Sequence, residues 1–244
     1  QKVYERTTGI LPNTVSGFCP GCMHSTVHKI IGEAADELGQ LDNLVRVEVL
    51  DAAVWDSSTL TIAAHGRACA VATGIKRSTP DSLVYTYQGD GDLASIGLAE
   101  TMSAANRGEN FTVIFVNNGI YGMTGGQMAP TTLIGMKATT APGGRDPEVH
   151  GYPMHVVEIL DQLTAPYYLE RVSCNTPQNV MKARNAIKKG FQYQLEGRGF
   201  SLIEIVTSCP TNWGLSTLDS LKFLEEKMFA EYPLGLVRDK GAEK

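Results

Sequence analysis

The chain has 244 residues, of which 43% are hydrophobic and 19% are charged, and its formal net charge is −5. This composition is typical of a folded globular protein, and the acidic balance argues against nucleic acid or an anionic membrane surface as the main partner. No hydrophobic run approaches the length of a membrane span, and residues 1–5 lack the hydrophobic segment of a secretory signal. We therefore expect a cytoplasmic protein.

Strand-like and helix-like hydrophobic patterns alternate along the chain. Up to residue 116 they predict, in order, a helix over 27–38, a strand over 45–50, a helix over 63–75, a strand over 83–87, a helix over 93–106 and a strand over 111–116. After a glycine-rich loop over 119–153 they predict a helix over 156–163, a strand over 167–172, a helix over 177–195, a strand over 200–206 and a helix over 217–230. This alternation is typical of an α/β protein with one open, mostly parallel sheet that binds ligands at the carboxyl ends of its strands.

The segment over 89–118 is the most informative part of the sequence. Gly89-Asp90-Gly91-Asp92 follows one predicted strand, and Asn117-Asn118 follows the next. A carboxylate and a carboxamide at two strand ends offer oxygen ligands to a hard cation such as Mg²⁺, which commonly bridges to phosphate oxygens. The glycines let backbone N–H groups approach a diphosphate, and the following helix points its positive end at the same place. The arrangement resembles the fingerprint of thiamine-diphosphate enzymes.

The five cysteines form a second notable set, and their odd number argues against a disulfide framework. Cys19 and Cys22, in a Cys-Pro-Gly-Cys turn, can bind one metal ion or two corners of a cluster, and Cys209 is a third candidate ligand. The pair alone is also compatible with half of a zinc site or with a redox dithiol. For Cys69 and Cys174 we favour buried, inert thiols.

Six strings occur in one order along the chain: CPGC from residue 19, HGRA from 65, GDGDLASIG from 89, NN from 117, YGMTGGQMAPTT from 121 and CPTNWG from 209. With them the chain resembles the β subunits of 2-oxoacid:ferredoxin oxidoreductases. The resemblance implies a single thiamine-diphosphate-binding domain of the pyrophosphate type over residues 1–244, with an N-terminal CPGC segment and a C-terminal helical extension. It also implies oxidative decarboxylation of a 2-oxoacid to acyl-CoA and CO₂, with electrons passed to ferredoxin.

Carried over by position, the resemblance implies a cofactor site. Asp90, Asn118 and the backbone carbonyl of Ile120 would bind Mg²⁺. His65 would be a catalytic residue that contacts the cofactor, although a lone histidine in a helix is more often structural. The further contacts to thiamine diphosphate would come from Gly89, Asp90, Gly91, Asp92, Asn118, Ile120, Gly122 and Met123.

The resemblance also implies a [4Fe–4S] cluster, of which Cys19, Cys22 and Cys209 match three ligands. The fourth ligand has no counterpart, because residues 50–56 contain no cysteine. Cys69 or an oxygen of Asp51 could take its place.

In this family a glutamate on the aminopyrimidine ring comes from a pyrimidine-binding domain on the α subunit. We therefore expect the chain to be inactive alone and to assemble with an α subunit and further small subunits. Residues 47–64 contain no Lys or Arg, which favours a hydrophobic or aromatic 2-oxoacid over 2-oxoglutarate. A non-oxidative thiamine-diphosphate enzyme half, a scaffold subunit without a functional cluster, and a zinc-binding module are the alternatives.

Overall fold

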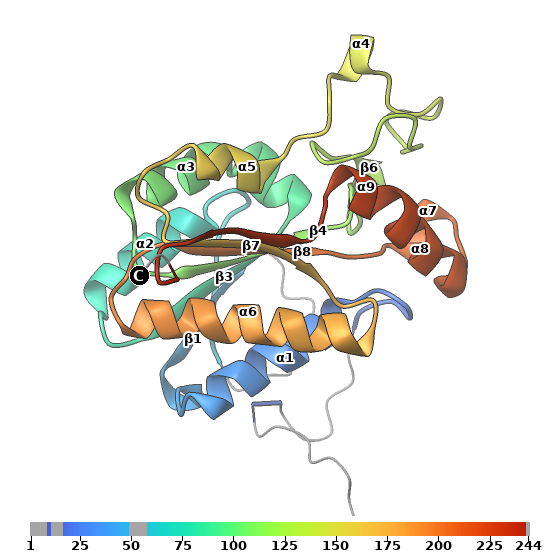
Figure 1. Cartoon of the computed structure of the whole chain (residues 1–244). Helices are drawn as coiled ribbons and strands as arrows, with labels where there is room; N and C mark the ends of the chain where they lie inside the picture. The colour runs from blue at the N-terminus through green and yellow to red at the C-terminus, as the bar shows by residue number, and fades with distance from the viewer. Residues whose placement is uncertain (1–8, 11–16, 49–57, 243–244) are drawn as a thin grey trace, which may run out of the picture.

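A seven-stranded sheet forms the centre of the protein, as seen in a computed structural model that describes residues 9–10, 17–48 and 58–242 (Figure 1). The strands lie in the order β2-β1-β3-β4-β8-β7-β9. Their bounds are β1 Leu44–Glu48, β2 Thr59–Ile62, β3 Leu83–Gly89, β4 Thr112–Asn117, β7 Tyr168–Ser173, β8 Ser201–Val206 and β9 Gly235–Asp239. All neighbouring strands run parallel except β9, which is antiparallel to β7. The expected open, mostly parallel α/β sheet is confirmed.

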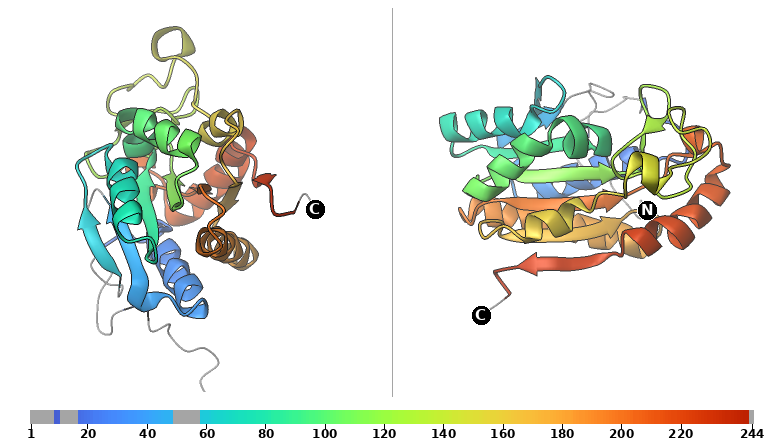
Figure 2. Two further views of the ribbon diagram at one scale, coloured as in Figure 1. Left: turned by 90° about the vertical axis from the view of Figure 1, so that its left-hand side faces the viewer. Right: turned by 90° about the horizontal axis from the view of Figure 1, so that it is seen from above.

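Helices cover both faces of the sheet (Figures 1 and 2). The helices are α1 His24–Glu37, α2 Ala68–Ser78, α3 Leu98–Arg107, α4 Pro147–His150, α5 Val156–Asp161, α6 Pro177–Leu195, α7 Pro210–Trp213, α8 Thr217–Phe223 and α9 Phe229–Glu231. α1 and α6 lie on one face, and α2, α3 and α5 lie on the other. Every residue of β4 and β8 is buried, as expected for strands with both faces covered.

Alternate residues of the central strands enter two separate hydrophobic cores. Tyr85 and Ile114 pack in the core under α1 and α6, whereas Val84 and Val113 pack in the core under α2, α3 and α5. Charged residues also connect the helices, because Arg184 of α6 binds Glu33 and Glu37 of α1. The two helices on that face are therefore held together by charge as well as by packing.

Several local features differ from the sequence prediction, and one is that the helix predicted over 217–230 contains a π-helical turn, Leu224–Met228, between α8 and α9. The helix predicted from residue 63 begins at Ala68, because residues 64–67 form a turn in which Gly66 has a φ of +75°. The helix predicted over 93–106 consists of a π-helical turn, Asp92–Ile96, followed by α3. β2 and the edge strand β9 were not predicted.

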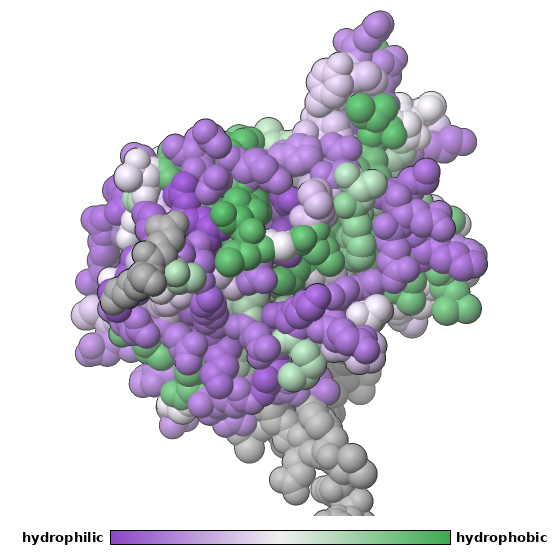
Figure 3. All heavy atoms as spheres, in the orientation of Figure 1, coloured by the Kyte–Doolittle hydropathy of each residue, from purple (hydrophilic) through white to green (hydrophobic). Residues whose placement is uncertain are grey.

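The loop over 119–153 contains a small β-hairpin, β5 Ile120–Tyr121 with β6 Gln127–Met128, and then an arm that carries α4 and projects away from the body (Figure 1). On the side of the molecule where β9 forms the sheet edge, hydrophobic surface gathers across the middle and polar surface surrounds it (Figure 3). In the described part of the chain, no helix is both long and hydrophobic enough to cross a membrane.

Candidate cofactor site

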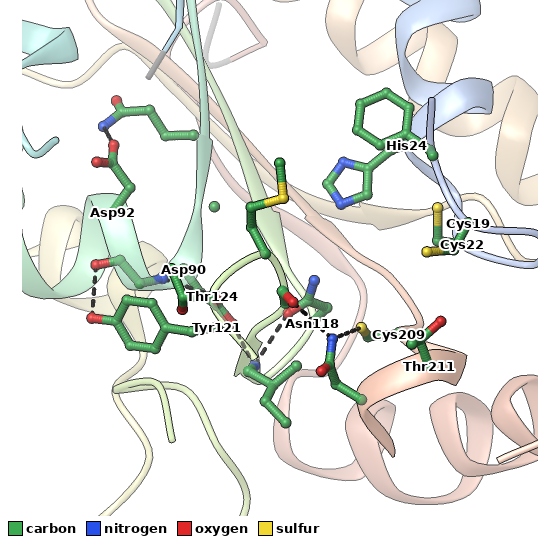
Figure 4. A pocket seen from close by; sticks show the side chains of 18 of the residues that line it. Cys19, Cys22, His24, Asp90, Asp92, Asn118, Tyr121, Thr124, Cys209 and Thr211 are labelled. Carbon is green, nitrogen blue, oxygen red and sulfur yellow. Dashed lines mark hydrogen bonds between the residues drawn. The ribbon is translucent and has the colours of Figure 1, made fainter. Parts of the chain in front are cut away.

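A pocket of about 630 Å³ lies at the carboxyl ends of β3, β4 and β8 (Figure 4). Its walls come from the turn after β3, the hairpin after β4, the segment after β8, the Cys-Pro-Gly-Cys turn and the loop that carries His65. All of the site residues predicted from the sequence line this one pocket: Cys19, Cys22, His65, Gly89, Asp90, Gly91, Asp92, Asn118, Ile120, Gly122, Met123 and Cys209. The fold therefore brings together segments that lie up to 190 positions apart in the sequence, from Cys19 to Cys209.

Asp90 is a buried carboxylate that has hydrogen-bond donors but no cationic partner among the described residues. Only 2% of the residue is exposed. One carboxylate oxygen accepts from the N–H of Gly91 at 2.8 Å, and the other accepts from the N–H of Ile120 at 3.1 Å and from the hydroxyl of Thr131 at 2.7 Å. Burial raises the pKa of Asp90 to about 6, although these donors favour the ionised form. The carboxylate is therefore a site where a bound cation would be stabilising.

Asn118 places its side-chain oxygen beside Asp90. The N–H of Ile120 donates to Asn118 Oδ1 and to Asp90 Oδ2, in both cases at 3.1 Å, so the two oxygens converge on one backbone group. Asn117 has a different role, because its amide donates to Glu204 at 2.7 Å inside the core. Of the two adjacent asparagines, Asn118 lines the pocket and Asn117 supports the strand end.

Asp92 holds the His65 loop against the turn after β3. Its carboxylate accepts from the N–H of Gly66 at 2.7 Å and from the side chain of Gln88 at 2.5 Å, and it lies 3.4 Å from His65 Nδ1. Because both of its oxygens have protein partners, Asp92 anchors this loop in addition to lining the pocket. The side chain of His65 is half exposed, at 53%.

The glycines after β3 serve two different purposes. A Cβ atom on Gly89 would meet no other atom within 4 Å, so this residue leaves open space in the pocket. A Cβ atom on Gly91 would lie 2.1 Å from the ring of Tyr121, whose hydroxyl donates to the Gly91 carbonyl at 3.2 Å. The sequence predicted that both glycines let a ligand approach, whereas the structure shows that Gly91 also makes room for a side chain.

Three predicted cluster cysteines line the pocket but do not form a compact ligand set. Cys19 is exposed, whereas Cys22 and Cys209 are half-buried. Figure 4 shows Cys19 and Cys22 beside each other and Cys209 apart from them, toward Asn118. Burial raises the pKa of Cys22, and the neighbouring Cys19 and Cys209 raise it further. Across the described residues, no three His, Cys, Asp or Glu side chains are grouped so that they could hold a metal ion together.

The structure also places the candidate fourth ligands. Cys69 is buried in the core, where its thiol donates to Gln88 at 3.3 Å, and burial raises its pKa to about 12. It does not line the pocket and cannot replace a cluster ligand without moving. Cys174 is buried too, and its pKa is likewise raised to about 12. Asp51 lies outside the described residues.

Sequence reasoning missed an aromatic group beside the cysteines. His24 Nδ1 lies 2.6 Å from the hydroxyl of Tyr87, and its ring stacks on Phe18 at a centroid distance of 4.8 Å. Burial lowers the pKa of His24 to about 4, so its imidazole is neutral at physiological pH. His24 and Tyr87 both line the pocket. In the sequence, only their positions next to the CPGC and GDG strings indicated that they could belong to the site.

A parallel sheet with a pocket at the carboxyl ends of adjacent strands is the arrangement of α/β proteins that bind a ligand at that edge. The family model of the thiamine pyrophosphate enzymes, C-terminal TPP binding domain, matches residues 44–205. The chain belongs to this family and, within it, to the subunits of 2-oxoacid:ferredoxin oxidoreductases.

Individual relatives support the family assignment. The chain is 49% identical to the ketoisovalerate oxidoreductase subunit VorA of Methanothermobacter thermautotrophicus, over 99% of this chain and 51% of that protein. It is 36% identical to the 2-oxoglutarate synthase subunit KorB of Methanocaldococcus jannaschii, over 86% of this chain and 77% of that protein. The chain thus spans about half the length of the VorA relative.

A solved structure also supports the family assignment. The 2-oxoglutarate:ferredoxin oxidoreductase from Magnetococcus marinus, determined with 2-oxoglutarate, coenzyme A and succinyl-CoA bound, matches with a TM-score of 0.77 and 26% identity. The match covers 98% of this chain and 87% of that chain. The similarity therefore extends over nearly the whole chain.

Proposed function

We propose that this chain is the cofactor-binding unit of a cytoplasmic enzyme complex that oxidatively decarboxylates a 2-oxoacid. The products would be acyl-CoA and CO₂, and the electrons would pass to ferredoxin. Thiamine diphosphate and Mg²⁺ would bind in the pocket at the carboxyl ends of β3 and β4. The family assignment and the free state of all five cysteines support this proposal.

The observation that carries the proposal is the charge of Asp90. A carboxylate that is 2% exposed and has no ion pair among the described residues lacks the cation that normally accompanies a buried charge. Asn118 Oδ1 adds a second hard oxygen beside it, so the donor set suits Mg²⁺. The residues present therefore fit a cation that binds a diphosphate, with the carbonyl of Ile120 as the proposed third ligand.

Thiamine diphosphate, when bound, supplies a nucleophilic ring carbon and an electron sink for decarboxylation. The chain's own contribution is to orient it. Gly89 leaves space for the diphosphate, and Gly91, Asp92, Gly122 and Met123 form the adjoining wall. The contact of Asp92 with His65 Nδ1 favours a proton on that nitrogen, which orients the imidazole for the proposed role of His65.

A [4Fe–4S] cluster on Cys19, Cys22 and Cys209 is the second part of the proposal. The Cys-Pro-Gly-Cys spacing supports it, as does the fact that all three residues line the cofactor pocket. As they are placed, the three thiols do not form a ligand set, so the proposed cluster is supported by the cysteine spacing, the shared pocket and the family resemblance but not by a preformed site. This separation favours, as a second candidate, a cofactor-binding unit that has no cluster.

The complete enzyme would also contain a pyrimidine-binding domain on an α subunit, and further small subunits. The substrate would be a hydrophobic or aromatic 2-oxoacid, because the described residues that line the pocket include no Lys or Arg to bind a distal carboxylate. Such an acid has a hydrophobic group where 2-oxoglutarate has its distal carboxylate, and we propose that this pocket contacts that end of the substrate.

Metal and cofactor analysis of the complete complex, purified without oxygen, tests the proposal. We expect bound thiamine diphosphate, Mg²⁺, iron and sulfide, and coenzyme A-dependent reduction of ferredoxin that is faster with 2-oxoisovalerate than with 2-oxoglutarate. Asp90→Ala should abolish cofactor binding, whereas Asp81→Ala, which removes an exposed carboxylate just before β3, should not.

Unchanged cofactor affinity in Asp90→Ala would refute the proposed site. Cofactor without iron would support the second candidate, and full turnover by the single chain would refute the need for partner subunits.

A further inference from the structure

Two adjacent threonines lie behind the proposed cation site, outside the pocket. Thr131 and Thr132 are both fully buried, although they belong to a long loop that also contains many exposed residues. Buried hydroxyl groups need hydrogen-bond partners, and the partners of these two identify their role.

Each threonine donates a hydrogen bond to one of the two chain segments that form the proposed cation site. The hydroxyl of Thr131 donates to Asp90 Oδ2 at 2.7 Å, at the end of β3. The hydroxyl of Thr132 donates to the carbonyl of Gly119 at 2.5 Å, in the turn between Asn118 and Ile120. Neither hydroxyl donates within its own segment, so the pair connects the loop to the two strand ends that carry the proposed ligands.

Two side chains further along the chain hold the backbone around the threonines. The buried guanidinium of Arg145 donates to the carbonyls of Pro130 and Thr132, both at 2.7 Å. The hydroxyl of Tyr232 donates to the carbonyl of Thr131 at 2.7 Å. Because three consecutive carbonyl groups are held in this way, the Thr131 hydroxyl has a fixed position from which to orient the carboxylate.

We propose that Thr131 is a positioning residue that sets the affinity of the site for Mg²⁺ by orienting the carboxylate of Asp90. The proposal rests on the proposed function of the pocket. Groups that hydrogen-bond a metal ligand fix its rotamer, and their loss typically lowers metal affinity about 10- to 100-fold. Here the backbone N–H groups of Gly91 and Ile120 would remain after the loss of Thr131, so the carboxylate would keep its partners but lose the donor that comes from the loop.

Titration of thiamine diphosphate into the complete complex at a series of Mg²⁺ concentrations tests the inference. We expect Thr131→Val to raise the Mg²⁺ concentration needed for half-maximal cofactor binding by about 10- to 100-fold. Saturating Mg²⁺ should restore binding. Thr131→Ser, which keeps the hydroxyl, should stay close to the wild-type value, and Thr131→Ala gives the same comparison if the valine variant does not fold.

Thr112→Val is the matched control. Thr112 is a fully buried threonine on β4 whose hydroxyl accepts from Gln194, at the opposite end of the strand from the site. Its loss should lower the melting temperature without changing the Mg²⁺ dependence. If Thr131→Val and Thr112→Val show the same Mg²⁺ dependence, Thr131 is only a packing residue and the inference is overturned.

Asp90→Asn separates this inference from the proposed function. If Asp90→Asn removes the Mg²⁺ dependence of cofactor binding while Thr131→Val leaves it unchanged, the proposed site stands and the role of Thr131 does not. If Asp90→Asn has no effect on cofactor binding, the site itself is wrong.

Discussion

Gly91 offers a direct test of how the turn after β3 is built. Its backbone is helical, with φ of −66° and ψ of −38°, so alanine is compatible with the conformation and would stabilise it by about 0.5–1 kcal/mol. Its environment is not compatible, because a Cβ atom would lie 2.1–2.5 Å from three ring atoms of Tyr121. The ring would have to swing away and would lose its hydrogen bond to the Gly91 carbonyl.

We expect Gly91→Ala to lower the free energy of unfolding by about 1–3 kcal/mol, the usual cost of forcing extra atoms into a packed site. For a chain of this size each kcal/mol lowers the melting temperature by about 2–4 °C. In a Tyr121→Ala background the clash is gone, so Gly91→Ala should then be neutral or slightly stabilising. Denaturant unfolding of the four proteins in this double-mutant cycle gives the coupling energy.

Gly89→Ala is the matched control, because a Cβ atom there meets nothing within 4 Å. It should leave the unfolding free energy unchanged or raise it slightly, and it should weaken cofactor binding because the added methyl group enters the pocket. If Gly91→Ala proves equally destabilising with and without the Tyr121 ring, the steric explanation is incorrect and Gly91 is required for another reason.

Three further predictions concern the supporting residues. Asn118→Ala should weaken Mg²⁺-dependent cofactor binding at least tenfold in a titration. Asn117→Ala should chiefly lower the unfolding free energy, by about 1–3 kcal/mol, because one oxygen of the buried Glu204 carboxylate loses its donor while the other keeps Arg171. Arg171→Met should lower the unfolding free energy, measured by denaturant unfolding, by about 3–5 kcal/mol, because two carboxylates lose their buried partner. A decrease no larger than that of a surface substitution would contradict this prediction. Burial raises the pKa of Asp239, but hydrogen bonds from Lys189 and a tyrosine hydroxyl outweigh burial, so the net pKa is lowered. The ionised carboxylate therefore stabilises the folded chain at neutral pH, and this contribution is lost as the pH falls below about 4. Asp239→Asn should therefore be less stable than the wild type at pH 7, by a margin that shrinks as the pH falls below about 4.

The sequence predicted the central strands and the long helix well because their signals are local. The strands β3, β4 and β8 are buried on both faces, so their segments form nearly continuous hydrophobic runs that indicate a strand. The helix over 177–195 has the predicted bounds because Thr176 caps its first turn and Pro177 starts it. The pocket was foreseen for a similar reason, since parallel strands place their carboxyl ends at one edge.

The remaining features depend on partners that are distant in sequence. Nothing near Gly91 indicates that the ring of Tyr121, thirty positions later, occupies the space where a side chain would lie. The link from Thr131 to Asp90 spans 41 positions, and that from Tyr232 to Thr131 spans 101. The predicted start of the second helix failed because the contacts of Asp92 hold residues 65–66 in a turn that no local pattern indicates.

The burial of Asp90 connects the stability of the fold to its proposed cofactor. A pKa of about 6, raised from 3.8, means that ionising this carboxylate in the folded chain costs about 3 kcal/mol at neutral pH relative to the unfolded chain. A cation that binds there removes this cost, and any ligand specific to the folded state adds stability in proportion to the logarithm of its concentration. The loop that carries Thr131 adds a hydrogen bond to the ionised carboxylate, so it stabilises the form that binds a cation. Cofactor binding and the ordering of the 119–132 loop should therefore stabilise each other.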